Sequence, residues 1–279
     1  MTSRETGLTD ERRHFSTYYF ANIVCNVLRD PFPYIRNLDG FWGSEFVTRF
    51  SEPFPKWSAL HAFIEFVVTD LLFEEDGKSV GDSGKPPKLW VEYAADFYGI
   101  ENIDFKTWLS EAREPSHVCC DDDVYDFYSE LQVAGEEYEN LISEIVDDAF
   151  SVLFSHRSLL LDLNEGISGG ITDLDAPQSD PDFGHLFTPK GRLKRAHVPE
   201  WASRAVFYRD RGRCVLCDKD LTGLLSPDFS RHMDHIVALA NGGINDVTNL
   251  QLLCEACNLQ KLHFRSSTRD KLQPWYERP

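Results

Sequence analysis

Two Cys-x-x-Cys pairs constrain this chain more than any other feature. Cys214 and Cys217 form the first pair, Cys254 and Cys257 form the second, and 36 residues lie between the pairs. Four thiolates complete the tetrahedral coordination of Zn²⁺ and leave no open position, so the pattern predicts one structural zinc ion per chain. A simple zinc ribbon separates its pairs by only about 15–20 residues. The spacing therefore indicates that another element is inserted between the two halves of a zinc site.

The other three of the seven cysteines need separate interpretations. Cys25 lies in an apolar run of helical spacing and is expected in the core, where a free cysteine behaves as a small hydrophobe. Cys119 and Cys120, together with His117, are candidates for a second metal site. No pair with ligand spacing lies near them, so the sequence argues against that site.

The formal net charge of −18 combines two regions of opposite sign. Residues 190–279 carry a net charge of +5, whereas residues 1–189 carry −23. Nucleic-acid binding depends on Lys and Arg side chains that neutralise phosphates. The charge distribution therefore places any nucleic-acid function in the last third of the chain.

Apolar residues at helical spacing, separated by Gly and Pro, predict a series of helices in the first part of the chain. They are expected over residues 9–30, 57–74, 89–98, 105–113 and 121–163, the last as one helix or as two that break near Gly135. The acidic triplets at residues 74–76 and 121–123 predict a solvated surface, with partner docking as the other interpretation. We expect residues 1–163 to form an acidic α-helical domain.

Residues 164–197 are rich in Gly, Ser, Asp and Pro, a composition typical of a flexible linker. The segment ends in a basic patch, Lys190, Arg192, Lys194 and Arg195, which is placed either to contact phosphates or to fold back on the acidic domain. Residues 198–279 are expected to form a second domain. The predicted fold class is mainly α, with a small zinc-stapled domain at the C-terminus.

Hydropathy argues against membrane contact. No apolar run approaches the ~18 residues of a membrane span, and charged residues stand near the N-terminus where a signal peptide needs an apolar stretch. We therefore expect a soluble, cytoplasmic protein.

The segment between the cysteine pairs carries a specific series of motifs. The order along the chain is Arg209-Asp210, Gly212 to Cys217, Asp234-His235-Ile236, Gly242-Gly243, Asn249-Leu250 and Cys254 to Lys261. In this order, over about residues 199–265, the motifs resemble those of the HNH endonuclease family. Asn258 stands where the family name has its third histidine, so the chain resembles an HNN variant.

The resemblance implies a ββα-metal nuclease fold with its chemistry in the inserted element. His235 would be the general base, since a neutral imidazole accepts a proton near neutral pH. Asp234 and Asn258 would hold a catalytic Mg²⁺ or Mn²⁺ through oxygen atoms, and Asn249 would orient the loop that carries His235. Successive side chains of a strand point to opposite faces, so residues 234 and 235 can serve one site only if the strand ends there.

The resemblance also implies a substrate and partners. DNA is the expected substrate, RNA stays open, and Lys261, Arg213 and Arg265 are expected to contact phosphates. Because small nucleases of this kind often occur in restriction or antiviral (anti-phage) defence systems, the resemblance suggests such a role for this chain. The acidic domain would then bind a protein partner or a second copy of the chain. The alternative function is a catalytically inactive zinc-ribbon protein that binds nucleic acid or another protein.

Overall fold

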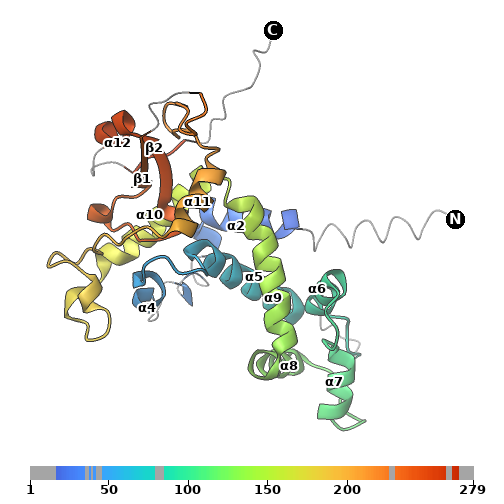
Figure 1. Ribbon diagram of the computed structural model, residues 1–279. Helices are drawn as coiled ribbons and strands as arrows, with labels where there is room; N and C mark the ends of the chain where they lie inside the picture. The colour runs from blue at the N-terminus through green and yellow to red at the C-terminus, as the bar shows by residue number, and fades with distance from the viewer. Residues whose placement is uncertain are drawn as a thin grey trace. The chain divides into compact units, whose positions relative to one another are not determined.

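The computed structural model describes residues 17–34, 38, 40–41, 46–78, 85–225, 230–261 and 266–269 (Figure 1). The fold is mainly helical, which confirms the predicted class. The helices are α2 (Thr17–Arg29), α4 (Phe46–Ser51), α5 (Ala59–Gly77), α6 (Trp90–Tyr98), α7 (Phe105–Ala112), α8 (Asp121–Ala134), α9 (Glu136–Leu153), α10 (Arg157–Asp173), α11 (Glu200–Arg209) and α12 (Glu255–Lys261). The strands β1 (Arg231–His235) and β2 (Leu250–Cys254) form an antiparallel sheet.

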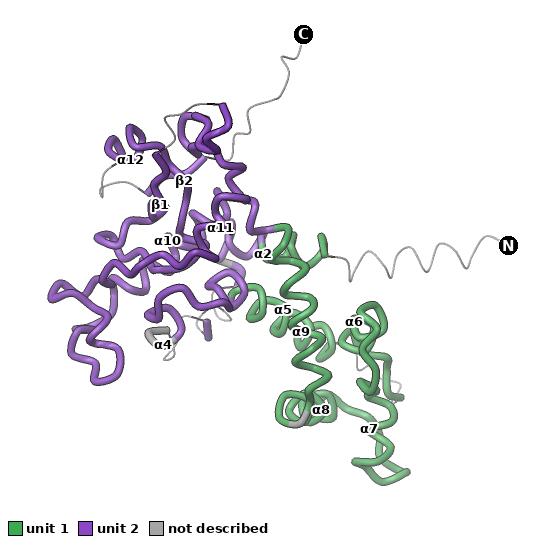
Figure 2. The backbone as a smooth tube through the Cα atoms, in the orientation of Figure 1, with its two compact units in different colours: residues 1–24, 63–152 green, residues 25–62, 153–279 purple. Residues whose placement is uncertain are grey.

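The described residues fall into two compact units, coloured separately in Figure 2. The first unit lies within residues 1–24 and 63–152, and the second within residues 25–62 and 153–279. The functional division predicted at residues 163 and 198 follows other limits and stays a prediction. Among the residues that the structure describes, no helix combines the length and the apolar character needed to cross a membrane.

The predicted helices over residues 57–74, 89–98 and 105–113 are confirmed within a few residues by α5, α6 and α7. The start of the first predicted helix, at Thr9, lies outside the described residues, and α2 accounts for the rest. The long acidic helix does break at Gly135, where an added Cβ would lie 2.4 Å from the carbonyl oxygen of Leu131. A second break, before Arg157, separates α9 from α10.

The prediction of a flexible linker over residues 164–197 is wrong for its first part, because α10 continues to Asp173. Leu160, Leu163, Ile167 and Ile171 are buried at steps of three and four residues, so they form an apolar stripe that anchors the helix. Composition alone suggested a linker because glycines lie between these apolar residues and conceal their helical spacing. Residues 177–179 and 184–186 form short 3-10 turns.

The two acidic triplets do not form a wholly solvated surface, because the third residue of each is buried. Asp76 is fully buried in the first unit, and its carboxylate accepts hydrogen bonds from the backbone nitrogens of Trp90 and Val91 at the start of α6. The Tyr128 hydroxyl donates to the same carboxylate at 2.5 Å. Burial is the main cause that raises the pKa of Asp76 to about 6. Asp76 therefore joins α5, α6 and α8.

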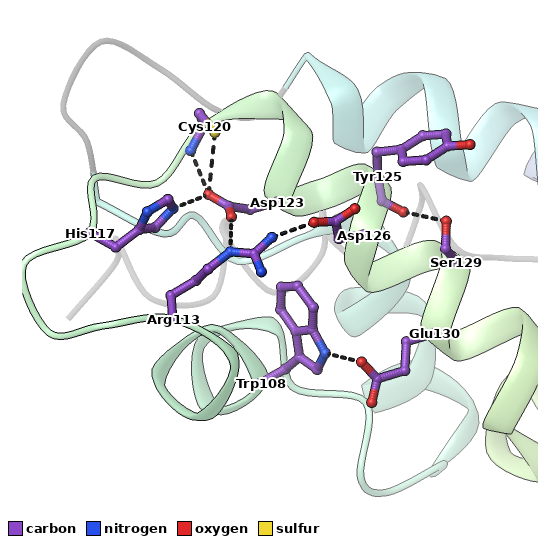
Figure 3. Close-up of polar contacts among 9 residues, drawn as sticks. All are labelled: Trp108, Arg113, His117, Cys120, Asp123, Tyr125, Asp126, Ser129 and Glu130. Atoms are coloured by element: carbon purple, nitrogen blue, oxygen red, sulfur yellow. Dashed lines mark hydrogen bonds and ion pairs between the residues drawn. The ribbon is translucent and has the colours of Figure 1, made fainter.

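Asp123 has the equivalent role at the start of α8 (Figure 3). Its carboxylate accepts from the Cys120 backbone nitrogen at 2.9 Å, from the Arg113 Nε at 2.8 Å, and lies 2.7 Å from the His117 Nε2. Trp108, nearby, donates from its indole nitrogen to Glu130 at 2.7 Å. The polar cluster thus caps α8 and connects it to the segment that follows α7.

The second unit has a core to which distant segments contribute. Ala202 and Val206 of α11, Leu252 of β2 and Val247 pack together with Phe54, which precedes α5. Two hydrogen bonds fix the same early segment, from the Phe54 nitrogen to the Asn245 carbonyl oxygen at 2.7 Å and from the Ala59 nitrogen to the Asp246 carboxylate at 3.0 Å. The small sheet therefore depends on residues near position 54 for part of its core.

Candidate metal centre and active site

A ββα element organises the C-terminal part of the second unit. β1 pairs with β2 so that Asp234 lies opposite Gln251 and His235 opposite Leu250, and α12 follows β2 without a loop. Every residue of β2 is buried. β1 ends at His235, which meets the condition under which Asp234 and His235 can face one site.

Four cysteine sulfur atoms gather beside this element. Cys214 and Cys217 come from the loop after α11, Cys254 ends β2 and Cys257 lies in α12, and their sulfur atoms are within 4.8 Å of one another. The Cys217 and Cys254 sulfur atoms are 3.7 Å apart. Tetrahedral zinc with bonds of about 2.3 Å requires sulfur atoms about 3.8 Å apart. The four-cysteine cluster therefore fits one Zn²⁺.

The loop that carries the first cysteine pair is a tight turn held by its own backbone hydrogen bonds. The Cys214 nitrogen donates to the Lys219 carbonyl oxygen at 2.9 Å, and the Asp218 nitrogen donates back to the Cys214 carbonyl oxygen at 2.8 Å. Gly212 enters the turn with a φ of +62°, and an added Cβ would lie 2.6 Å from the Thr222 methyl group. Glycine is required there on both counts.

A pocket of about 760 Å³ opens beside the ββα element. Its lining includes Asp234 and His235 from β1, Asn258 from α12 and Ala238 from the loop after β1. Three of the four residues expected to be catalytic therefore line one cavity.

His235 is almost fully buried, and neither ring nitrogen has a hydrogen bond of good geometry to a described residue. The pKa of His235 is lowered to about 4, mainly by burial. The positive charge of Arg195 lowers this pKa further, and the Asp234 carboxylate and the Asn245 amide oppose the shift. The imidazole is consequently neutral throughout the neutral pH range and has a free acceptor nitrogen.

Asn249, the fourth expected residue, is fully buried behind this site. Its side-chain oxygen accepts from the Val237 nitrogen at 2.8 Å, and its side-chain nitrogen donates to the carbonyl oxygens of Val237 and Ile244 at 3.0 and 2.9 Å. The backbone nitrogen of Ile236 donates to the Asn249 carbonyl oxygen at 2.7 Å. Asn249 thus holds the residues that directly follow His235.

Lys261 does not have the environment expected of a phosphate contact. Its side chain is 1% exposed, and its ammonium group donates to the Asp234 carboxylate at 2.7 Å, to the Ile236 carbonyl oxygen at 3.1 Å and to the carbonyl oxygen of His235. All three ammonium protons have acceptors. The prediction is wrong because β1 and the loop after it lie where α12 directs this side chain.

The other two expected phosphate contacts lie elsewhere. Arg213 is exposed in the cysteine loop, donates to the Asp218 carbonyl oxygen at 3.0 Å and is not among the residues that line the pocket. Arg265 lies outside the described residues. Both assignments stay predictions.

Sequence reasoning missed two polar residues that support the site. Gln251 donates to the Asp234 carboxylate at 3.1 Å and to the Ser267 carbonyl oxygen at 2.9 Å. Asn245 donates to the Lys194 carbonyl oxygen at 2.8 Å. Gln251 occurs within an apolar strand run, and this position could have indicated a buried polar residue that makes specific hydrogen bonds. Asn245 gave no such signal, because its partner is distant in the sequence.

A second group of ligand-type side chains lies in the first unit. His117, Cys120 and Asp123 have their ligand atoms within 4.8 Å of one another. Asp123 already accepts from the Cys120 backbone and from Arg113, the capping arrangement described above. The geometry therefore gives these residues a structural role. The cluster contains His117 and Cys120, two of the three residues that the sequence had suggested for a second metal site, and has Asp123 in place of Cys119.

Comparison with known families bears on the segment that holds both sites. Residues 214–264 match the family model described as HNH endonuclease. Comparisons with the curated proteins and with the solved structures found no match. The matched segment contains all four cysteines, β1, β2 and α12. The C-terminal segment of this chain, over residues 214–264, is therefore an HNH endonuclease domain.

Proposed function

We propose that the protein is a metal-dependent endonuclease that hydrolyses phosphodiester bonds in DNA. The observation that carries this proposal is the pocket that Asp234, His235 and Asn258 line together, within the segment that matches the HNH endonuclease family. Hydrolysis needs a water molecule that loses its proton and a positive charge near the phosphate. The pocket supplies residues of the types that both tasks require.

In this proposal His235 is the general base. The neutral imidazole accepts the proton of the attacking water at a ring nitrogen, and burial keeps it neutral at working pH. Asn249 keeps the residues after His235 in place through its three side-chain hydrogen bonds. Lys261 and Gln251 fix the Asp234 carboxylate through one oxygen, Oδ2. The second carboxylate oxygen then points to no described donor.

Asp234 and Asn258 would hold Mg²⁺ or Mn²⁺. The donor set fits, because a carboxylate oxygen and an amide oxygen beside an open pocket suit a hard cation that keeps water and phosphate oxygens as its other ligands. When bound, the cation supplies the positive charge that stabilises the phosphate and the leaving oxygen. The zinc at the four cysteines has no open position and serves the fold.

The test is cleavage of supercoiled plasmid, linear duplex, single-stranded DNA and RNA, with and without added Mg²⁺ or Mn²⁺. We expect cation-dependent cleavage of DNA that His235→Ala abolishes. Asn241→Ala, a change at an exposed residue of the same domain, is the matched control and should retain activity. Identical behaviour of the protein and His235→Ala would refute the proposal, and preferential cleavage of RNA would refute its substrate.

One observation favours the alternative of an inactive zinc-ribbon binding protein. The Lys261 ammonium group already neutralises Asp234, which weakens the need for a bound cation there. Isothermal titration with Mg²⁺ and Mn²⁺ separates the two functions. Cation binding that Asp234→Asn removes supports the nuclease, and nucleic-acid binding without cation binding or cleavage supports the alternative.

The biological setting follows from the family resemblance alone. We propose a role in restriction or anti-phage defence, with the acidic first part of the chain binding a protein partner or a second copy. Phage plating on cells that carry the protein or its His235→Ala variant tests the role. Sedimentation of the full chain tests self-association, and a monomer at every concentration would contradict it.

A further inference from the structure

A basic loop outside the matched HNH segment forms one wall of the active-site pocket. Residues 188–195, called the basic loop below, contribute seven of their side chains or backbones to the lining: Thr188, Pro189, Lys190, Arg192, Leu193, Lys194 and Arg195. Its ends are held together by a β-bridge between Phe187 and Leu193, both buried. The Thr188 nitrogen donates to the Arg192 carbonyl oxygen at 2.7 Å. The loop is thus a short hairpin.

The turn of this hairpin and its far end are both fixed. Gly191 adopts a φ of +67°, which allows its nitrogen to donate to the Thr188 carbonyl oxygen at 2.9 Å. At the far end, the buried Asn245 side chain donates to the Lys194 carbonyl oxygen at 2.8 Å and accepts from the Ala196 nitrogen at 3.3 Å. Asn245 belongs to the HNH segment, so the basic loop is anchored to the loop that follows His235.

The charges on the loop are largely unneutralised. Lys190 and Arg195 are exposed, and neither has an ion pair with any residue in the described ranges. Lys194 uses its ammonium group on the His185 carbonyl oxygen at 2.7 Å, and Arg192 is half-buried. Asp234 is the one acidic residue among those that line the pocket, and Lys261 is already paired with it. The pocket therefore has a cationic wall in addition to its proposed catalytic residues.

Arg195 lines the same pocket as Asp234, His235 and Asn258. Its guanidinium group is exposed and has no ion pair with a described residue, so it is available to a phosphate that enters the pocket. Guanidinium groups bind phosphate oxygens with two parallel hydrogen bonds.

We infer that the basic loop is a phosphate-binding wall of the active site, in which Arg195 and Lys190 hold phosphates of the DNA strand that enters the pocket. The inference rests on the proposed nuclease function and names the contacts that Lys261 does not supply. It also explains why a fixed hairpin, which lies before the zinc site in the sequence, closes one side of this pocket.

The test measures binding rather than cleavage. Fluorescence anisotropy with a labelled DNA duplex, in the His235→Ala background and without added Mg²⁺, gives the dissociation constant between 50 and 200 mM salt. Each lost phosphate contact should weaken binding roughly tenfold near 0.1 M salt and reduce the slope of log K against log salt by about one. We therefore expect this change for Arg195→Ala and twice the slope change for the double variant with Lys190→Ala.

Two controls separate charge at this site from general charge and from folding. Arg204→Ala removes an exposed arginine of α11 that does not line the pocket, and it should leave the salt slope unchanged. Arg195→Lys keeps the charge and should restore most of the affinity. Equal slopes for Arg195→Ala, the double variant and Arg204→Ala overturn the inference, and the proposed nuclease function stands if the parent chain still cleaves. A parent chain that neither binds nor cleaves nucleic acid overturns both.

Discussion

The change Asn249→Ala tests how the site is built. It removes three side-chain hydrogen bonds and leaves the Val237 nitrogen, the Val237 carbonyl oxygen and the Ile244 carbonyl oxygen without partners in a fully buried position. Each orphaned buried group costs about 1–3 kcal/mol. At the low end of that range the three groups together destabilise the ββα element by about 3 kcal/mol. Since 1.4 kcal/mol is a factor of ten, this corresponds to roughly a hundredfold change in local opening.

Hydrogen exchange followed by mass spectrometry measures this opening in the full chain. We expect protection of the amides in β1 and β2 to fall about a hundredfold in Asn249→Ala. Asn241→Ala makes the same chemical change at an exposed position and should leave protection unchanged. Asn249→Asp keeps the acceptor for the Val237 nitrogen but places an acceptor against two carbonyl oxygens. That variant should lose at least as much protection as Asn249→Ala.

Two results would refute the reasoning. A loss of protection below tenfold in Asn249→Ala would mean that water or a rearranged loop satisfies the three groups. An Asn249→Asp variant as well protected as the parent would mean that the donor side of the amide contributes nothing.

The remaining predictions concern stability, zinc content and the salt dependence of DNA binding. Burial raises the pKa of Asp76 to about 6, so the folded state holds this proton more tightly than the unfolded state does. The free energy of unfolding, measured by urea titration, should therefore fall by roughly 3 kcal/mol as pH rises from about 4 to 6. Asp76→Asn should flatten this pH profile. Cys254→Ser should release zinc, measured by elemental analysis, whereas Cys25→Ser should retain one ion per chain. Phe54→Ala should destabilise the second unit by about 3–5 kcal/mol in thermal unfolding. Residues 198–279 alone, which lack Phe54, should not fold, and a cooperative unfolding transition of that fragment would contradict the role given to Phe54. Lys261→Met should destabilise the fold by about 3 kcal/mol, the lower end of the cost of breaking a buried ion pair, because the Asp234 carboxylate is 15% exposed and keeps its hydrogen bond from Gln251. The same variant should leave the salt slope of DNA binding unchanged, and a slope reduced by one would restore its role as a phosphate contact.

Residue spacing along the chain was enough to predict the local elements and the metal ligands. Apolar residues at helical spacing located α6 and α7, each of which has one apolar face, and a longer apolar run located α5, of which residues 59–64 are all buried. The two Cys-x-x-Cys pairs predicted the four-cysteine cluster that fits Zn²⁺, because the short spacing directs both sulfur atoms of a pair toward one ion. The motif order identified the ββα segment and placed Asp234, His235 and Asn258 on it, and these three do line one pocket.

The distant segments that complete the site could be identified only from the folded chain. Phe54 fills the core of the ββα unit, Lys261 pairs with Asp234 and not with solvent, and the basic loop lies against the pocket. These contacts join residues far apart in the chain, and neither spacing nor composition encodes the direction in which a side chain meets a distant partner. The burial of Asp76 and Asp123 has the same cause: within an acidic run, the fold alone selects the carboxylate that caps a neighbouring helix.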